Sequence, residues 1–256
     1  MKYIDLNADI GEAESPEGIQ AETDILNYVS SANIACGGHA GDAESMRRTV
    51  INAGEKGVVI GAHPAYPDRV NFGRSSNVLG QDISASDLKQ TLMQQIISLV
   101  EIAAEEGHEV KYIKPHGALY NDAVTSRQHA DVITDVMSEL DPNLILLGGP
   151  DSEMSRSTTA AGLAFVTEGF IDRRYTDDGH LLSRKIEGAV IKDQNARMAQ
   201  TKALVTSRQV DTYSGQTIRI NAQSLCLHGD SSGAVDTARR ARRAIESCGV
   251  TIRSFI

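Results

Sequence analysis

The segment from Ser31 to Asp42, SANIACGGHAGD, guides the interpretation of the whole chain. It begins as a short apolar run, breaks at Gly37 and Gly38, and places His39 shortly before Asp42. Glycine permits backbone conformations that other residues avoid, and aspartate is a favoured N-cap of helices. The segment therefore predicts a buried strand, a polar turn that carries a histidine, and a helix over 43–56 that begins after Asp42.

The same order of apolar run, histidine, and glycine or proline recurs at three other places, GAHPA (61–65), KPHGA (114–118) and LHGD (227–230). Further apolar runs occur without a histidine, and helical patterns lie between the runs. Strands that alternate with helices predict a mostly parallel sheet, and about seven such units over this length predict a closed α/β barrel. Besides the segment above, the predicted strands are 3–9, 58–62, 110–114, 144–149, 163–169 and 224–227.

The composition indicates one globular domain over 1–256. The chain has 256 residues, 41% of them hydrophobic, which is enough for a large core. No apolar stretch approaches the ~18 residues of a membrane helix, and the N-terminus lacks a signal-peptide core. A formal net charge of −9 argues against a nucleic-acid surface. Three cysteines give no disulfide framework, so we expect a cytoplasmic protein.

Several titratable residues should meet at one end of the barrel, because ligands bind where the carboxyl ends of parallel strands gather. Histidines in that position can act as acids, bases or oxyanion donors. Histidine and carboxylate together can also hold Zn²⁺ or another divalent metal, for which Asp9, His39 and His63 are the possible ligands. For each histidine the alternative is a hydrogen-bonded structural role. The catalytic candidates are Asp9, Glu12, His39, Asp42, His63, His116, His228 and Asp230.

Four further residues are candidates for substrate binding, namely Asn7, Lys114, Asp172 and Arg173. Lys114 lies two residues before a histidine, so in a strand it would point the same way and could neutralise a substrate carboxylate. An Asp172–Arg173 pair at the barrel mouth could clamp an acid or a phosphate through the guanidinium group. A solvated lysine and a surface ion pair are the alternatives. The sequence contains no GxxxxGK[ST] or GxGxxG motif.

Five segments of the sequence resemble the signature blocks of the LamB/YcsF family, the A subunits of 5-oxoprolinase. The resemblance implies a distorted (β/α) barrel related to glycoside hydrolases and polysaccharide deacetylases. It also implies ATP-dependent hydrolysis of 5-oxo-L-proline to L-glutamate, with Mg²⁺ accompanying ATP and with two partners, the B and C subunits. The blocks are DLNADIGE (5–12), SANIACGGHAGD (31–42), GAHPAYPD (61–68), KPHGALYN (114–121) and LCLHGD (225–230).

The chain departs from the family pattern at three positions. Ala8 stands where the family often has cysteine, Ser75 where it has a second arginine, and Ile171 where it has alanine. Ala8 excludes a cysteine mechanism at that position. Two other functions stay open, a metal-dependent amide hydrolase of the polysaccharide-deacetylase type and a non-catalytic subunit that binds a small acid.

Overall fold

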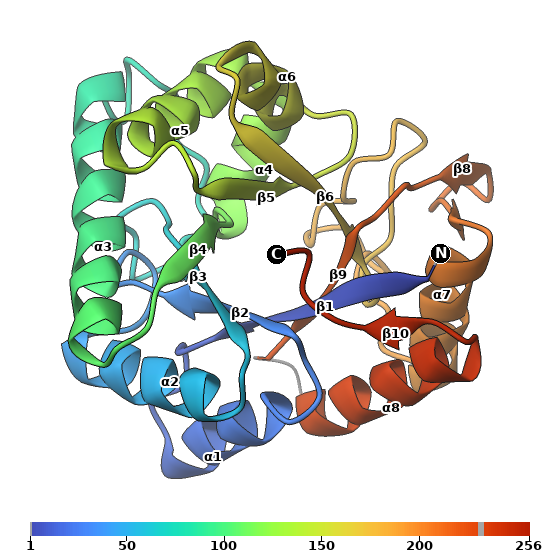
Figure 1. Ribbon diagram of the computed structural model, residues 1–256. Helices are drawn as coiled ribbons and strands as arrows, with labels where there is room; N and C mark the ends of the chain where they lie inside the picture. The colour runs from blue at the N-terminus through green and yellow to red at the C-terminus, as the bar shows by residue number, and fades with distance from the viewer. Residues whose placement is uncertain (1, 230–232) are drawn as a thin grey trace.

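The structure, a computed structural model, describes residues 2–229 and 233–256. Within them, seven parallel strands form a closed barrel, because the last of these strands pairs with both its predecessor and the first (Figure 1). The predicted barrel is thus confirmed, and each predicted strand boundary agrees to within a residue. The barrel strands, in order, are β1 (Tyr3–Ile10), β2 (Ser31–Ala35), β3 (Val59–His63), β4 (Val110–Ile113), β5 (Ile145–Gly148), β6 (Ala164–Phe170) and β9 (Ser224–His228).

Helices surround the barrel on the outside (Figure 1). Two differ from expectation. The helical pattern over 21–30 belongs to a helix that begins earlier, because Ser15 accepts a hydrogen bond from the Gly18 amide and Pro16 occupies the first turn. The helix that follows His116 directly was not predicted. The helices are α1 (Pro16–Ile25), α2 (Ala43–Glu55), α3 (Ala85–Glu105), α4 (Gly117–Thr125), α5 (Arg127–Leu140), α6 (Glu153–Ala160), α7 (Gln194–Thr206) and α8 (Ala234–Ser247).

The C-terminal tail closes the amino-terminal end of the barrel. The short strand β10 (Thr251–Ile252) pairs in parallel with the start of β1. The Phe255 ring then packs edge-on against Tyr112 of β4, with 5.2 Å between the ring centroids. Outside the barrel, β7 (Gln209–Asp211) and β8 (Thr217–Arg219) form an antiparallel hairpin. With one end closed by the tail, the other end carries the site.

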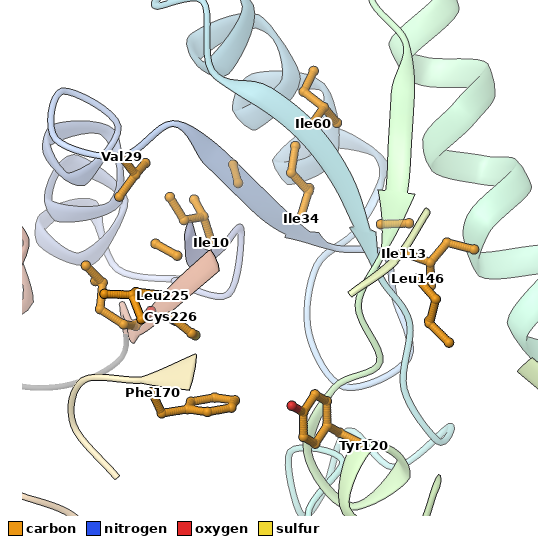
Figure 2. Packing of buried hydrophobic residues seen from close by; sticks show 14 of the residues in the cluster. Ile10, Val29, Ile34, Ile60, Ile113, Tyr120, Leu146, Phe170, Leu225 and Cys226 are labelled. Atoms are coloured by element: carbon orange, nitrogen blue, oxygen red, sulfur yellow. Dashed lines mark hydrogen bonds between the residues drawn. The ribbon is translucent and has the colours of Figure 1, made fainter. Parts of the chain in front are cut away.

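The main core lies between the barrel and its helices (Figure 2). Alternate residues of β1, namely Leu6, Ala8 and Ile10, belong to this outer core and are almost fully buried. Successive side chains of a strand point to opposite faces, so Asn7 and Asp9 point toward the barrel axis. The side chain of Ala8 therefore points away from the barrel axis. A cysteine at this position would not reach the polar interior of the barrel. No helix in the described ranges is long and apolar enough to cross a membrane.

Candidate active site

Three histidines gather at the carboxyl end of the barrel, as the sequence predicts. His63 ends β3, while His39 and His116 follow β2 and β4, and all three are buried. The rings of His39 and His116 stack with centroids 3.6 Å apart and 2° between their planes. His116 Nδ1 lies 3.0 Å from His63 Nε2. The three imidazoles thus form one contiguous cluster.

Two carboxylates join this histidine cluster. Glu12, in the turn after β1, places Oε1 2.9 Å from His39 Nε2 and 3.6 Å from His116 Nδ1. Asp9 Oδ2 lies 3.5 Å from His63 Nε2. Glu12 and the three histidines offer ligand atoms that all lie within 4.8 Å of one another, so they could hold a metal ion. Asp9 belongs instead to a second such group, with Cys226 and His228.

Burial keeps two of these imidazoles neutral. Desolvation, helped by the charge that His63 can carry, lowers the pKa of His39 to about 2. Desolvation and the neighbouring His39 and His63 likewise hold the pKa of His116 well below its usual range. Near neutral pH both rings are therefore uncharged, and each has a nitrogen lone pair that can bind a metal or accept a hydrogen bond.

Lys114 lies at the centre of a buried polar network directly beneath the cluster. Its ammonium nitrogen is 2.8 Å from Asp9 Oδ1, 3.1 Å from Glu168 Oε1 and 2.9 Å from Cys226 Sγ. Burial disfavours the charged forms of both Lys114 and Asp9. Their mutual attraction outweighs that opposition, so the pKa of Asp9 lies well below its usual value and the pKa of Lys114 well above. Burial raises the pKa of Glu168, since one lysine compensates two carboxylates only in part.

Sequence reasoning missed several members of this network. Asn33 donates to Asp9 Oδ1 at 2.7 Å, and the Tyr112 hydroxyl donates to Asn33 Oδ1 at 2.7 Å. Glu168 accepts from Asn7 Nδ2 at 3.0 Å. The signal that could have found them is a polar side chain at alternate positions of otherwise apolar strands, which places it on the inner face of the barrel.

Asn7, predicted to bind substrate, is enclosed in the same network. It is fully buried and also donates to Ser224 Oγ at 2.7 Å. Through these bonds Asn7 positions the polar residues on the axis. Lys114, the other substrate candidate on the barrel wall, is 2% exposed and engaged with carboxylates, so it is not a solvated lysine.

The loop over 64–77 covers the histidine cluster. His116 Nε2 lies 3.0 Å from the Phe72 carbonyl oxygen, and Phe72 adopts the left-handed conformation with φ of 55°. At Gly73, φ is +62°, and a Cβ atom would lie 2.9 Å from His39 Cβ and 3.0 Å from His116 Cδ2. A side chain at position 73 would therefore displace the histidines, which explains the glycine.

His228 is paired with Asp172 and lies beside Asp9. His228 Nδ1 is 2.8 Å from Asp172 Oδ2, and the His228 ring stacks on Phe170. Asp172 therefore pairs with His228 and not with Arg173, the partner that the sequence predicted. Arg173 is buried and donates from Nη2 to the Leu182 carbonyl at 2.6 Å, because its side chain points into the loop that follows β6. Burial lowers the pKa of Arg173 to about 10.

Two aspartates remain from the list of catalytic candidates, Asp42 and Asp230. Asp42 is exposed, and its side chain accepts from the Ser45 amide at 2.8 Å, which confirms it as the N-cap of α2. Its recorded contacts lie within the first turn of that helix, so the structure does not bring Asp42 to the histidines. Asp230 lies outside the described residues.

A small, largely apolar cavity adjoins the site where β5 and β6 end. Its volume is about 10 Å³, room for about one water molecule, and the rings of Tyr120, Phe170 and Tyr175 form part of its lining. Figure 2 shows Tyr120 and Phe170 facing one another, with ring centroids 5.8 Å apart. The buried Tyr120 hydroxyl has no hydrogen-bond partner among the described residues. Phe170 links the cavity to the network, since Lys114 Nζ lies 5.4 Å from its centroid.

Solved structures share this architecture. The lactam utilization protein from Thermus thermophilus is 34% identical, with a TM-score of 0.89 and coverage of 100% of both chains. A T48 deacetylase solved with substrate is 10% identical, with a TM-score of 0.50 over 98% of this chain and 87% of its own. At that identity the second likeness concerns the fold alone, and it agrees with the expected relation to deacetylase barrels.

Curated relatives match over nearly the whole length. The A subunit of 5-oxoprolinase from Nocardia farcinica is 43% identical over 99% of both sequences, and that from Photorhabdus laumondii is 40% identical over 100% of both. The LamB/YcsF family profile matches residues 4–256. Fold, sequence blocks and relatives agree, and the chain belongs to the LamB/YcsF family.

Proposed function

We propose that this chain is the A subunit of an ATP-dependent 5-oxoprolinase, which opens the lactam of 5-oxo-L-proline to L-glutamate. In this reaction ATP is converted to ADP and phosphate, with Mg²⁺ accompanying the nucleotide. The observation that carries the proposal is the 40–43% identity, over the full length of both sequences, to relatives named as A subunits of 5-oxoprolinase. The buried acid–base cluster at the barrel mouth supports a catalytic rather than a purely binding role.

The chemistry suits the residues at the mouth. A five-membered lactam is an unactivated amide, and phosphorylation of its carbonyl oxygen by ATP would make it reactive. Hydrolysis then needs a proton acceptor for water and positive groups near the developing oxyanion. The neutral rings of His39 and His116 can orient the attacking water by hydrogen bonds, and the Lys114 ammonium supplies positive charge beside Asp9.

We place the lactam ring beside Tyr120, Phe170 and Tyr175, where the small cavity would have to widen to admit it. Ligand sites combine apolar walls with a few polar groups that fix orientation. Here the unpartnered Tyr120 hydroxyl would serve that purpose. His228, stacked on Phe170, would lie between the ring and the network of Lys114.

The partner subunits would complete nucleotide handling. The sequence lacks a phosphate-binding GxxxxGK[ST] loop, so we assign part of the ATP site to the B and C subunits. A cytoplasmic location would give the complex access to ATP.

Reconstitution tests this division of labour. The purified chain should release little or no glutamate from 5-oxo-L-proline and ATP, whereas adding both partners should raise the rate by orders of magnitude, with ADP formed in parallel. Misplacing reactive groups by about 1 Å can cost about 10²-fold in rate, which is why incomplete assembly should be nearly inactive. Turnover by the isolated chain at the rate of the complex would refute the proposal.

The cluster of Glu12, His39, His63 and His116 favours one second candidate, a metal-dependent amide hydrolase that needs no ATP. Amide hydrolysis by the isolated chain without nucleotide, abolished by a chelator, would support it over the 5-oxoprolinase. A non-catalytic role in binding a small acid would be supported if His63→Gln and His116→Gln left the turnover of the reconstituted complex unchanged.

A further inference from the structure

We propose that Glu12, His63 and His116 form a binding site for one divalent transition-metal ion, with Zn²⁺ the preferred occupant. His39 supports the site from outside: its ring is stacked parallel to that of His116, so the two rings cannot direct lone pairs at the same ion, and it holds Glu12 instead. Three observations lead to this site, which does not depend on the proposed lactam chemistry: the hydrogen bonds that fix the two facing ring nitrogens, the spacing of the ligand atoms, and the backbone contacts that hold the rings.

The tautomer of His63 follows from its backbone contact. His63 Nδ1 lies 2.7 Å from the Lys114 carbonyl oxygen. A carbonyl can only accept, so Nδ1 carries the hydrogen and donates it. In the neutral ring, His63 Nε2 is then an acceptor with an available lone pair.

The tautomer of His116 follows in the same way. His116 Nε2 lies 3.0 Å from the Phe72 carbonyl oxygen, so Nε2 is the donor and Nδ1 carries the lone pair. The two acceptor atoms, His63 Nε2 and His116 Nδ1, nevertheless face each other at 3.0 Å. Two lone pairs at this distance repel, and a cation that both can bind would turn the repulsion into attraction.

Glu12 completes the set. Its Oε1 lies 3.6 Å from His116 Nδ1, and His39 Nε2 holds the same oxygen at 2.9 Å. In a tetrahedral zinc site with bonds of about 2.0–2.1 Å, ligand atoms are about 3.3 Å apart. The separations of 3.0 and 3.6 Å from His116 Nδ1 to His63 Nε2 and to Glu12 Oε1 bracket that value. Two imidazoles and one carboxylate, with the fourth position open, also match a known ligand set of zinc.

The backbone around the cluster holds the rings as metal ligands are usually held. Ligating histidines almost always donate the other ring N–H to a carbonyl or a carboxylate, which orients the ring. His63 and His116 both do so, to Lys114 and Phe72. Gly73 keeps the covering loop in contact with His39 and His116. Asp9, the carboxylate expected from the sequence, is bonded to Lys114 instead, so Glu12 takes its place.

Metal analysis of the purified full-length chain tests the site. After chelator treatment and removal of the chelator, Zn²⁺ should bind with a stoichiometry near one in competition with a chromophoric indicator. Co²⁺ should give the visible absorption of a site with nitrogen and oxygen ligands. Loss of a supporting group alone typically weakens metal affinity about 10–100-fold, so loss of a ligand in Glu12→Gln, His63→Gln or His116→Gln should weaken it by at least about 100-fold.

His108→Gln is the matched control, because His108 is partly buried on another part of the chain and should leave Zn²⁺ affinity unchanged. Circular dichroism and thermal denaturation establish which variants are folded. Glutamine has nearly the same shape as glutamate, so Glu12→Gln provides a folded variant if the histidine variants do not fold. Absence of a stoichiometric site for Zn²⁺ and Co²⁺ in the wild-type chain, or wild-type affinity in folded Glu12→Gln, would overturn the proposal.

Discussion

Replacement of Lys114 by methionine should destabilise the fold strongly, although the two side chains are similar in length. The Lys114 ammonium lies in the barrel interior within 3.1 Å of carboxylate oxygens of both Asp9 and Glu168. Methionine removes the charge and leaves two carboxylates that burial alone would keep from ionising. The perturbation thus isolates the electrostatic role of the lysine from its packing.

The expected loss is large compared with the total stability. Removing one partner of a buried ion pair costs about 3–5 kcal/mol, whereas a whole domain is stable by about 5–15 kcal/mol. For a chain of this size each kcal/mol corresponds to about 2–4 °C in Tm, so Tm should fall by roughly 6–20 °C.

The loss should also depend on pH with a definite sign. In the wild type the pKa of Asp9 is depressed on folding, so its contribution to stability is complete above the ordinary value of 3.8 and is lost below it. In Lys114→Met, burial should raise the pKa of Asp9 and further raise that of Glu168. A carboxyl group whose pKa is raised on folding lowers the free energy of unfolding of the protein as the pH rises through that pKa. The difference between wild type and variant should therefore widen from about pH 4 to about pH 8.

Urea denaturation at about pH 5 and about pH 8, followed by circular dichroism, measures this difference. Lys111→Met is the control, since Lys111 lies on the same strand but is exposed, and it should change stability by less than about 0.5 kcal/mol. A loss below about 1 kcal/mol at the higher pH, or a loss equal at both pH values, would show that Lys114 does not compensate the buried carboxylates.

Three further substitutions separate catalysis from structure. His116→Gln should lower the turnover of the reconstituted complex by about 10²–10⁴-fold, the usual cost of losing one acid–base group; near-normal turnover in a folded variant would remove His116 from the reaction. Asp42→Ala should lower the free energy of unfolding by about 1 kcal/mol through loss of the helix cap, with kcat unchanged. A large fall in kcat would instead restore Asp42 as a catalytic candidate. Arg173→Lys should lower Tm, because its buried hydrogen bond to Leu182 is disturbed, and should leave KM for 5-oxo-L-proline within a few-fold. A KM raised well beyond tenfold would show that Arg173 holds the substrate after all.

Local sequence patterns were sufficient to predict the barrel and the histidines at its mouth. An apolar run of a few residues followed by a histidine and a turn residue indicates both a strand and the residue at its carboxyl end. Asp42 could likewise be identified as a helix cap from its neighbours alone. The helix after Gly117 was missed because a histidine, a glycine and no capping side chain precede it.

The pairing of the polar residues, in contrast, became known only from the folded barrel. Asp9 bonds to Lys114, 105 positions away, and Glu12 joins His39 across 27 positions. The partner of Asp172 is His228 and not the adjacent Arg173. Such choices depend on the relative rotation and register of distant strands, which a one-residue shift would reverse. Local periodicity determines the direction of a side chain within its own strand, whereas closure of the barrel determines which side chain it meets.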